Sequence, residues 1–191
     1  VYNVKEVICD GYRACNSITF YNTTNVICKG TTTQACDSSK HYNVTNLICN
    51  GSKTTSGPCR SITFDNTQMP LSIWTNVTCI GVQACSSSKI TNVTTVVCEG
   101  SQSDTCEYTT FKDVINTMCL SSHSRDICVA SKHINKNNQY NVVCGSLSGS
   151  TRCADMKCGE SSIHKEGPFK TCTNIAYSED YHNGIWVSSV R

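Results

Sequence analysis

The sequence VICDGYRAC, at residues 7–15, returns along the chain as a cysteine-rich phrase and decides the fold. Clear copies are VICKGTTTQAC (26–36), LICNGSKTTSGPC (47–59), VTCIGVQAC (77–85) and VVCEGSQSDTC (96–106), and looser copies are TMCLSSHSRDIC (117–128) and VVCGSLSGSTRC (142–153). A phrase repeated in this way can hold a series of metals, build copies of an active site, or stack levels of one structure. Spacing and residue type separate these possibilities.

The cysteines keep two periods. The first cysteine of the phrase recurs after 19, 21, 30, 19, 21 and 25 residues, and the first half of the pattern recurs 70 residues later. A period near 20 residues is typical of a repeat architecture. We predict a repeat domain over residues 1–153, with related units at about 1–68 and 76–130 and an insertion near 69–75. A divergent segment over 154–191 is expected to cap the repeats or to join them to a partner.

Short β segments fill each period. NVIC at 25–28 and its counterparts precede the first cysteines, and SITF at 17–20 and 61–64 follows the second ones. The alternation in SITF points Ile18, Phe20, Ile62 and Phe64 inward. No window keeps apolar residues at helical spacing. The pattern predicts an all-β, disulfide-rich parallel β-helix, or β-solenoid, of about seven rungs of roughly 20 residues each.

Asparagines recur at two fixed offsets from the first cysteine. Those three residues before it are Asn25, Asn46, Asn76, Asn116 and Asn141. Those six residues before it are Asn3, Asn22, Asn43, Asn92 and Asn138. Asparagine tolerates the left-handed backbone of tight turns, and stacked amides form ladders. We assign the ladder to the nearer offset and glycan-bearing turns to the farther one.

The combination of VxCxGxxAC with intervening SITF and NVIC resembles the cysteine-rich parallel β-helix repeat proteins of protist cell surfaces and secretions. The resemblance extends over about residues 7–153. It implies the same fold and a structural or surface role, and it carries no catalytic residue to transfer to this chain. The last forty residues depart from the pattern and inherit nothing from it.

The sixteen cysteines are expected to form disulfides, not metal sites. Zinc sites use cysteine pairs two to four residues apart, whereas this chain has no C-x-x-C and its histidines keep no fixed offset from the cysteines. The favoured within-rung pairs are Cys9–Cys15, Cys28–Cys36, Cys49–Cys59, Cys79–Cys85, Cys98–Cys106, Cys119–Cys128 and Cys144–Cys153, with Cys158–Cys172 closing a terminal loop. The sequence also allows disulfides between successive rungs, because cysteines on rungs ~4.8 Å apart are close enough to form them. The variable turn lengths favour bridges within each turn.

Composition places the chain outside the cell. Cysteines are abundant and even in number, and five Asn-x-Ser/Thr sequons are present, which together favour an N-glycosylated secreted or cell-surface protein. The sequon asparagines are Asn22, Asn43, Asn50, Asn76 and Asn92. The net charge of +2 without a basic run argues against nucleic acid, and no apolar run reaches the ~18 residues of a membrane span.

Binding and catalysis have weaker signals. Thr24, Thr45, Thr75 and Thr94 share one offset and suggest an ice-binding array, but three of them are the third residues of sequons. Acidic residues are few and scattered, so a polysaccharide-active enzyme is the less favoured alternative, and no catalytic residue or cofactor is expected.

The ends of the stack suggest how such a molecule functions. The chain begins almost inside a rung, and a solenoid end without a cap exposes backbone and core. The last strand signal comprises Ile185, Trp186, Val187 and Val190. It either caps its own rung or enters the open end of another copy. We expect an extracellular structural glycoprotein that assembles head-to-tail into a filament or surface layer. A monomeric module that adheres to a surface or binds polysaccharide or ice is the alternative.

Overall fold

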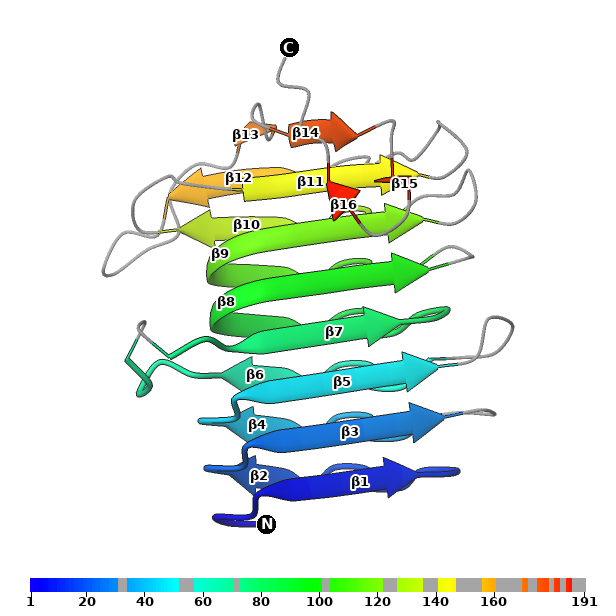
Figure 1. Cartoon of the computed structure of the whole chain (residues 1–191), viewed down its shortest axis with the longest axis vertical. Helices are drawn as coiled ribbons and strands as arrows, with labels where there is room; N and C mark the ends of the chain where they lie inside the picture. Colours follow the sequence, from blue (N-terminus) through cyan, green and yellow to red (C-terminus); the bar gives the residue numbers. More distant parts are fainter. Residues whose placement is uncertain are drawn as a thin grey trace.

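The structure, a computed structural model, describes residues 1–30, 34–51, 57–70, 73–100, 104–121, 127–135, 141–146, 156–160, 170–171, 175–178, 181–182 and 185–186. Its regular secondary structure in these residues is entirely β. The chain winds upward as a parallel β-solenoid from the blue N-terminal rung in Figure 1. The expected fold class is therefore confirmed.

The cysteine-bearing strands form one column of this coil. They are β1 (Glu6–Asp10), β3 (Asn25–Gly30), β5 (Asn46–Gly51), β7 (Asn76–Ile80), β8 (Lys89–Gly100), β9 (Thr110–Ser121) and β11 (Asn141–Ser146). Each pairs in parallel with the next, and first cysteines face first cysteines throughout, as in Cys9↔Cys28 and Cys98↔Cys119. The regular coil makes about five turns between β1 and β9, slightly fewer than the seven rungs expected, because the pairing becomes irregular beyond β11.

A second column runs behind the first in Figure 1. It contains β2 (Thr19–Tyr21), β4 (Lys40–Tyr42), β6 (Thr63–Asp65), the starts of β8 and β9, β10 (Lys132–Asn135) and β12 (Lys157–Glu160). Beyond it, β13 (Lys170–Thr171) pairs antiparallel with β12, and β14 (Ile175–Ser178) adds to β11. The C-terminal strands β15 (Tyr181–His182) and β16 (Ile185–Trp186) pair only with each other among the described strands.

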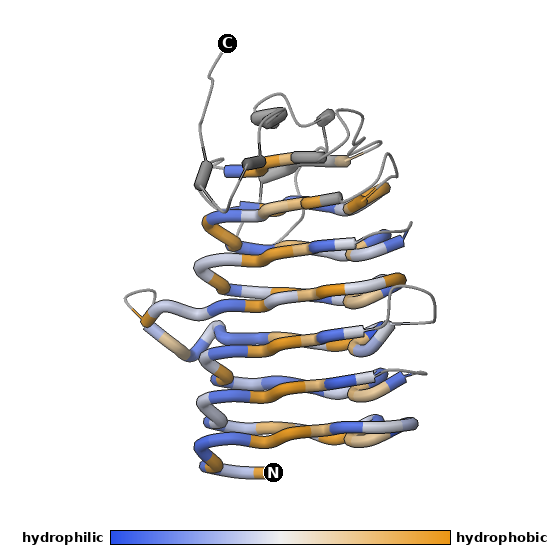
Figure 2. Tube along the Cα trace, turned by 45° about the vertical axis from the view of Figure 1, so that its right-hand side comes forward, coloured by the Kyte–Doolittle hydropathy of each residue, from blue (hydrophilic) through white to orange (hydrophobic). Residues whose placement is uncertain are grey.

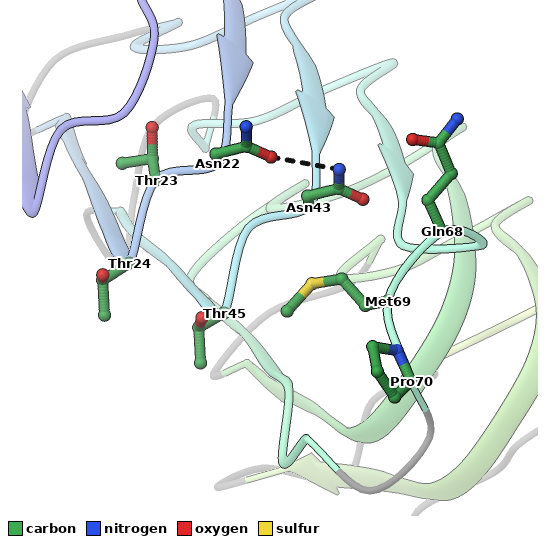
Figure 3. A pocket seen from close by; sticks show the side chains of 8 residues that line it. All are labelled: Asn22, Thr23, Thr24, Asn43, Thr45, Gln68, Met69 and Pro70. Carbon is green, nitrogen blue, oxygen red and sulfur yellow. Dashed lines mark hydrogen bonds between the residues drawn. The ribbon is translucent and has the colours of Figure 1, made fainter.

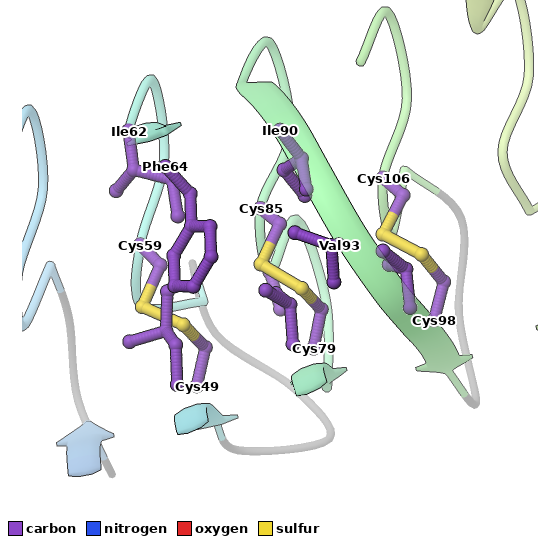
Figure 4. Packing of buried hydrophobic residues seen from close by; sticks show 14 of the residues in the cluster. Cys49, Cys59, Ile62, Phe64, Cys79, Cys85, Ile90, Val93, Cys98 and Cys106 are labelled. Atoms are coloured by element: carbon purple, nitrogen blue, oxygen red, sulfur yellow. A yellow bond between two sulfur atoms is a disulfide. The ribbon is translucent and has the colours of Figure 1, made fainter. Parts of the chain in front are cut away.

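Strand alternation and disulfides build the narrow core together. In β3, Val26 and Cys28 point inward and are fully buried, and hydrophobic segments recur at the same place in successive rungs (Figure 2). The bridges lie inside, stacked from rung to rung (Figure 4). The described pairs are Cys9–Cys15, Cys28–Cys36, Cys49–Cys59, Cys79–Cys85, Cys98–Cys106 and Cys119–Cys128. These six are the within-rung pairs that the sequence favours, so this part of the predicted pairing is confirmed.

The remaining cysteines lie at the edge of the described region. Cys144 is disulfide-bonded. Its expected partner Cys153 lies outside the described residues, as does Cys172. Cys158 belongs to β12, but only its backbone is described.

The second cysteine of each bridge occupies a strained turn. Its φ is positive in every described rung, from 54° at Cys106 to 63° at Cys59. Residues with a Cβ enter this region at a cost of roughly 1–2 kcal/mol, so other contacts must hold them there. The disulfide is one such contact, and stacking supplies another: the N–H of Cys36 donates to the Ala14 carbonyl at 2.8 Å in the preceding rung.

A ring column occupies the inner face of the second strand column. Phe20, His41 and Phe64 stack with centroid distances of 4.9 and 6.0 Å, and Phe111 stacks on His133 at 4.7 Å. Both histidines are buried. Burial lowers the pKa of each to about 3, so both rings are neutral at pH 7. His41 and His133 each stand five residues after a second cysteine, in the slot that Phe20, Phe64 and Phe111 occupy in other rungs. The expectation that histidines keep no fixed offset from the cysteines is therefore wrong for these two.

Asparagine ladders occur at both offsets from the first cysteine. At the nearer offset, Asn46 Nδ2 donates to Asn25 Oδ1 at 2.9 Å and Asn76 Nδ2 to Asn46 Oδ1 at 3.2 Å. Thr95 then interrupts the ladder, which resumes where Asn141 donates to Asn116 at 3.1 Å.

The expectation that the farther offset is free of a ladder is wrong. Asn22 Nδ2 donates to Asn3 Oδ1 and Asn43 Nδ2 to Asn22 Oδ1, both at 3.1 Å. All three residues also have the positive φ expected of turn asparagines. When a left-handed turn recurs in register, its side chains stack from rung to rung, as the side chains of paired strands do. One asparagine can therefore both adopt the turn conformation and form the ladder. Asn138 lies outside the described residues.

Buried Asn66 closes the rung from which the insertion departs. Its Oδ1 accepts from the Val44 N–H at 3.0 Å, and its Nδ2 donates to the Val44 carbonyl at 2.7 Å. Asn135 clamps Val114 in the same way, at 3.1 and 2.9 Å. In each case the side-chain amide bonds the backbone N–H and carbonyl that a peptide group of the next rung would otherwise bond. The backbone can therefore depart from the regular coil at these positions, and the buried N–H and carbonyl groups still have hydrogen-bond partners.

We expect Asn66→Ala to lower the free energy of unfolding by about 2–3 kcal/mol, because it leaves the buried N–H and carbonyl of Val44 without partners. Asn46→Ala, which removes an amide from the partly exposed ladder, should cost less than about 1 kcal/mol. Denaturant unfolding of the non-reduced proteins measures both. Equal losses would mean that Asn66 is only one more ladder residue.

Two further expectations require correction. Ile18 is 36% exposed although Phe20, Ile62 and Phe64 are buried, because the first rung has no rung before it in the structure. The four threonines at one offset do not form one continuous exposed rank: Thr24 is exposed and Thr45 half-buried, whereas Thr75 and Thr94 are buried. Each hydroxyl of the buried pair accepts the backbone N–H of the other, at 3.0 and 3.2 Å.

Candidate functional site

A cavity of about 270 Å³ opens at the corner between the second and third rungs and the insertion. Its lining consists of Asn22, Thr23, Thr24, Asn43, Thr45, Gln68, Met69 and Pro70. Figure 3 shows the two asparagines side by side, with Thr24 and Thr45 below them and the insertion forming the opposite wall. The insertion is held there because Asn92 Nδ2 donates to the carbonyls of Asn66 and Met69.

Polar groups without partners face this cavity. Asn43 Oδ1, the hydroxyls of Thr24 and Thr45, and the Gln68 amide make no side-chain hydrogen bond within the described part of the chain. Met69 and Pro70 add an apolar patch. None of the lining residues is charged. The chemistry offered is neutral: amides and hydroxyls beside a small apolar surface.

Trp74 is an exposed tryptophan in the insertion. Its side chain is 73% exposed, the largest value among the exposed hydrophobic residues. It lies two residues before Asn76, whose backbone N–H donates to the carbonyl of the lining residue Thr45 at 2.9 Å. Sequence reasoning placed this segment in an irregular insertion but assigned it no role.

The five sequon asparagines differ in environment. Asn22 and Asn43 line the cavity and belong to a ladder, while Asn76 is exposed and donates to Asn46. Asn50 is exposed on β5 and makes no described side-chain hydrogen bond. Asn92 is different, because both Nδ2 hydrogens are used, at 2.6 Å to Asn66 and 3.3 Å to Met69.

Among the described residues, the N-terminal rung is less completely buried than the rungs that follow it. Val7, Ala14 and Cys15 are only partly buried, whereas their counterparts Val26, Ala35 and Cys36 in the next rung are fully buried. Among the described strands, β1 pairs only with β3. Exposed hydrophobic residues also concentrate here, at Val1, Tyr2, Val4, Ile8, Tyr12 and Ile18.

The direction of the backbone groups of β1 follows from two bonds. The Gly11 N–H donates to Lys29, and the Lys5 carbonyl accepts from Asn25, so the odd-numbered residues face β3. Because strand residues alternate, Glu6, Ile8 and Asp10 direct their N–H and carbonyl groups toward the open edge. This edge can accept another parallel strand.

The C-terminal residues predicted for assembly lie in a different setting. Ile185 and Trp186 form β16 and pair with β15, whereas Val187 and Val190 lie outside the described residues. Their part in assembly stays a prediction.

Clustered metal ligands in the described residues are all cysteines. The three groups are Cys9, Cys28 and Cys36; Cys28, Cys49 and Cys59; and Cys98, Cys106 and Cys128. Every one of these sulfurs is in a disulfide, so the groups arise from the stacking of bridges. A bridged cysteine has no thiolate to offer a metal.

No protein-family profile, curated protein or solved structure shows significant similarity to this chain. In the described residues no helix has the length and hydropathy that crossing a bilayer requires. The bridges indicate an oxidising compartment, and a disulfide-rich β-solenoid suits an extracellular structural protein.

Proposed function

We propose that this protein is a secreted structural glycoprotein without enzymatic activity, and that copies of it stack head-to-tail through the β1 edge of the first described rung. The observation that carries the proposal is the incomplete burial of Val7, Ala14 and Cys15, whose counterparts one rung later are fully buried. A further rung laid on this end buries that core and pairs the open edge of β1. A head-to-tail contact that does not close a ring produces a filament.

Electron microscopy of the non-reduced protein at micromolar concentration tests the assembly. We expect wild type and Ile8→Val to form fibres, and Ile8→Pro to remain as single particles. Proline removes the Ile8 N–H that faces the open edge and leaves the β1–β3 hydrogen bonds in place. Circular dichroism and thermal unfolding of the Ile8→Pro protein confirm that it folds. Single particles from all three proteins, or fibres from a folded Ile8→Pro, would refute stacking through this edge.

N-glycans complete the proposal, and the structure suggests which sequons carry them. A sugar on Asn92 would replace a hydrogen that the fold uses to hold the insertion, whereas exposed Asn50 can accept one without loss. N-glycans are attached before the chain folds. Only chains whose glycans are compatible with the fold are therefore expected in the folded, secreted protein.

In secreted, folded protein from a eukaryotic host, glycopeptide mass spectrometry should therefore find sugar on Asn50 and none on Asn92. Asn50→Gln should lower the mass by one glycan and leave stability unchanged, while Asn92→Gln should leave the mass unchanged and lower stability. Sugar on Asn92 in the folded fraction would contradict this selection. Sugar on none of the five sequons would refute the glycoprotein assignment itself.

A further inference from the structure

We propose that the corner cavity binds a neutral sugar ring, with Asn43, Gln68 and Thr45 as its polar contacts and Trp74 as an aromatic contact at its rim. This inference deepens the proposed extracellular function and rests on it. It rests on the cavity, its unused polar groups and the exposed indole.

The polarity of the lining selects the ligand class. Lectin-like recognition of a neutral sugar needs donors and acceptors for hydroxyl groups, and amides and hydroxyls are both. The lining has no charge that would attract a phosphate or a carboxylate. The lining therefore offers no ion pair to an acidic or basic ligand.

The size and rigidity of the cavity agree with a small ligand. Its volume of about 270 Å³ is just below the usual range of ligand pockets, roughly 300–1,000 Å³, so one or two sugar rings fit. Asn22 is held from both sides, by its bonds to Asn3 and Asn43, and this fixes the position of the Asn43 amide. A site whose polar groups are held before binding loses less entropy when the ligand arrives.

The apolar contacts are also available. Pyranose rings carry apolar C–H faces, which pack on indole rings, and Trp74 is exposed and stands two residues before Asn76, whose N–H donates to the Thr45 carbonyl. Met69 and Pro70 lie on the opposite wall (Figure 3). The insertion thus supplies the aromatic and apolar contacts, and the coil supplies the amides.

Two sources can provide the sugar. One is a separate extracellular polysaccharide. The other is the chain's own N-glycan on Asn22 or Asn43, the two sequon asparagines that line the cavity. Both present the same neutral rings, and the experiment separates them.

The first arm uses glycan-free protein, made with its disulfides in a bacterial periplasm. Trp186→Phe leaves Trp74 as the single tryptophan, since the chain has two. Titration with cellobiose, mannobiose and chitobiose, followed by Trp74 fluorescence and calorimetry, should show a Kd of about 0.1–1 mM for at least one disaccharide. Trp74→Ala and Asn43→Ala, read by calorimetry, should weaken binding at least tenfold.

Matched controls keep this result specific. Tyr108→Ala removes another exposed aromatic side chain, and Asn50→Ala another exposed amide, and neither should change the Kd. Absence of binding by all three disaccharides, or equal weakening by the controls, would overturn the proposal. The fibre assay remains independent of that result, because Ile8 and the cavity residues are different sets.

The second arm uses protein from a glycosylating host. The glycan-free protein of the first arm is the comparison, so that no lining residue is changed. If the chain's own glycan fills the cavity, the glycosylated protein should not bind the disaccharide that the glycan-free protein binds. If both bind it equally, the sugar comes from a separate polysaccharide. Either result supports a sugar site, whereas loss of binding in both proteins overturns it.

Discussion

Lowering the pH from 7 to 5 should reduce the free energy of unfolding by about 4 kcal/mol through His41 and His133 alone. Both rings are buried in the stacked column, and burial lowers the pKa of each from 6.5 to about 3. Below pH 6.5 the two histidines therefore bind protons in the unfolded chain but not in the folded chain. This contribution to stability is fully present above pH 6.5 and is lost progressively as the pH falls from 6.5 toward 3.

Denaturant unfolding of the non-reduced protein at pH 7 and pH 5 measures the effect. The double variant His41→Phe/His133→Phe is the control, because phenylalanine already occupies this column at Phe20, Phe64 and Phe111. Its stability should change by less than about 1 kcal/mol over the same interval, since the remaining groups are common to both proteins. An equal pH dependence in wild type and variant would show that other groups cause it.

Removal of one interior disulfide should lower the free energy of unfolding by an amount comparable to that pH change. Cys79→Ala/Cys85→Ala should cost about 3 kcal/mol, and Cys9→Ala/Cys15→Ala about half as much. Both bridges span six residues, so the chain-entropy contribution is the same in the two variants. The difference comes from packing, because Cys79 and Cys85 are fully buried whereas Cys15 lies partly exposed in the terminal rung.

Paired alanines leave no unpartnered thiol to exchange with the other bridges. The two midpoints and slopes of denaturant unfolding give the comparison. Equal losses at the two sites would mean that the terminal rung is held as firmly as the interior, and that bridge strength depends on loop length alone.

The periodic part of the structure was open to prediction from the sequence. A cysteine phrase in fixed register predicts parallel strands, and variable turn lengths favour within-rung bridges such as Cys28–Cys36. The Asn25–Asn46 bond follows from the same periodicity. Each of these features repeats from rung to rung, so a single chain contains several copies of the signal.

Features that interrupt the period were not predictable. The cavity joins Asn22 and Asn43 to Met69 and Pro70, which belong to an insertion whose position the repeat register does not predict. Asn66 and Asn135 stand 69 residues apart, close to the longer period, and that spacing is a signal for the clamps that the sequence analysis did not use. The exposure of Ile18 depends on the absence of a preceding rung in the structure, which strand alternation does not encode.

The within-rung disulfides also determine how the molecule responds to a pulling force. Tension along the axis should separate one coil at a time, since none of the six described disulfides joins neighbouring coils. Between Cys79 and Cys98 the chain has 19 residues, which extend to roughly 65 Å. The Cys79–Cys85 bridge locks six of them into a 5.9 Å crossing, so each peeled coil releases only about 50 Å. A fibre of such subunits would lengthen in many short steps and would be more extensible when reduced.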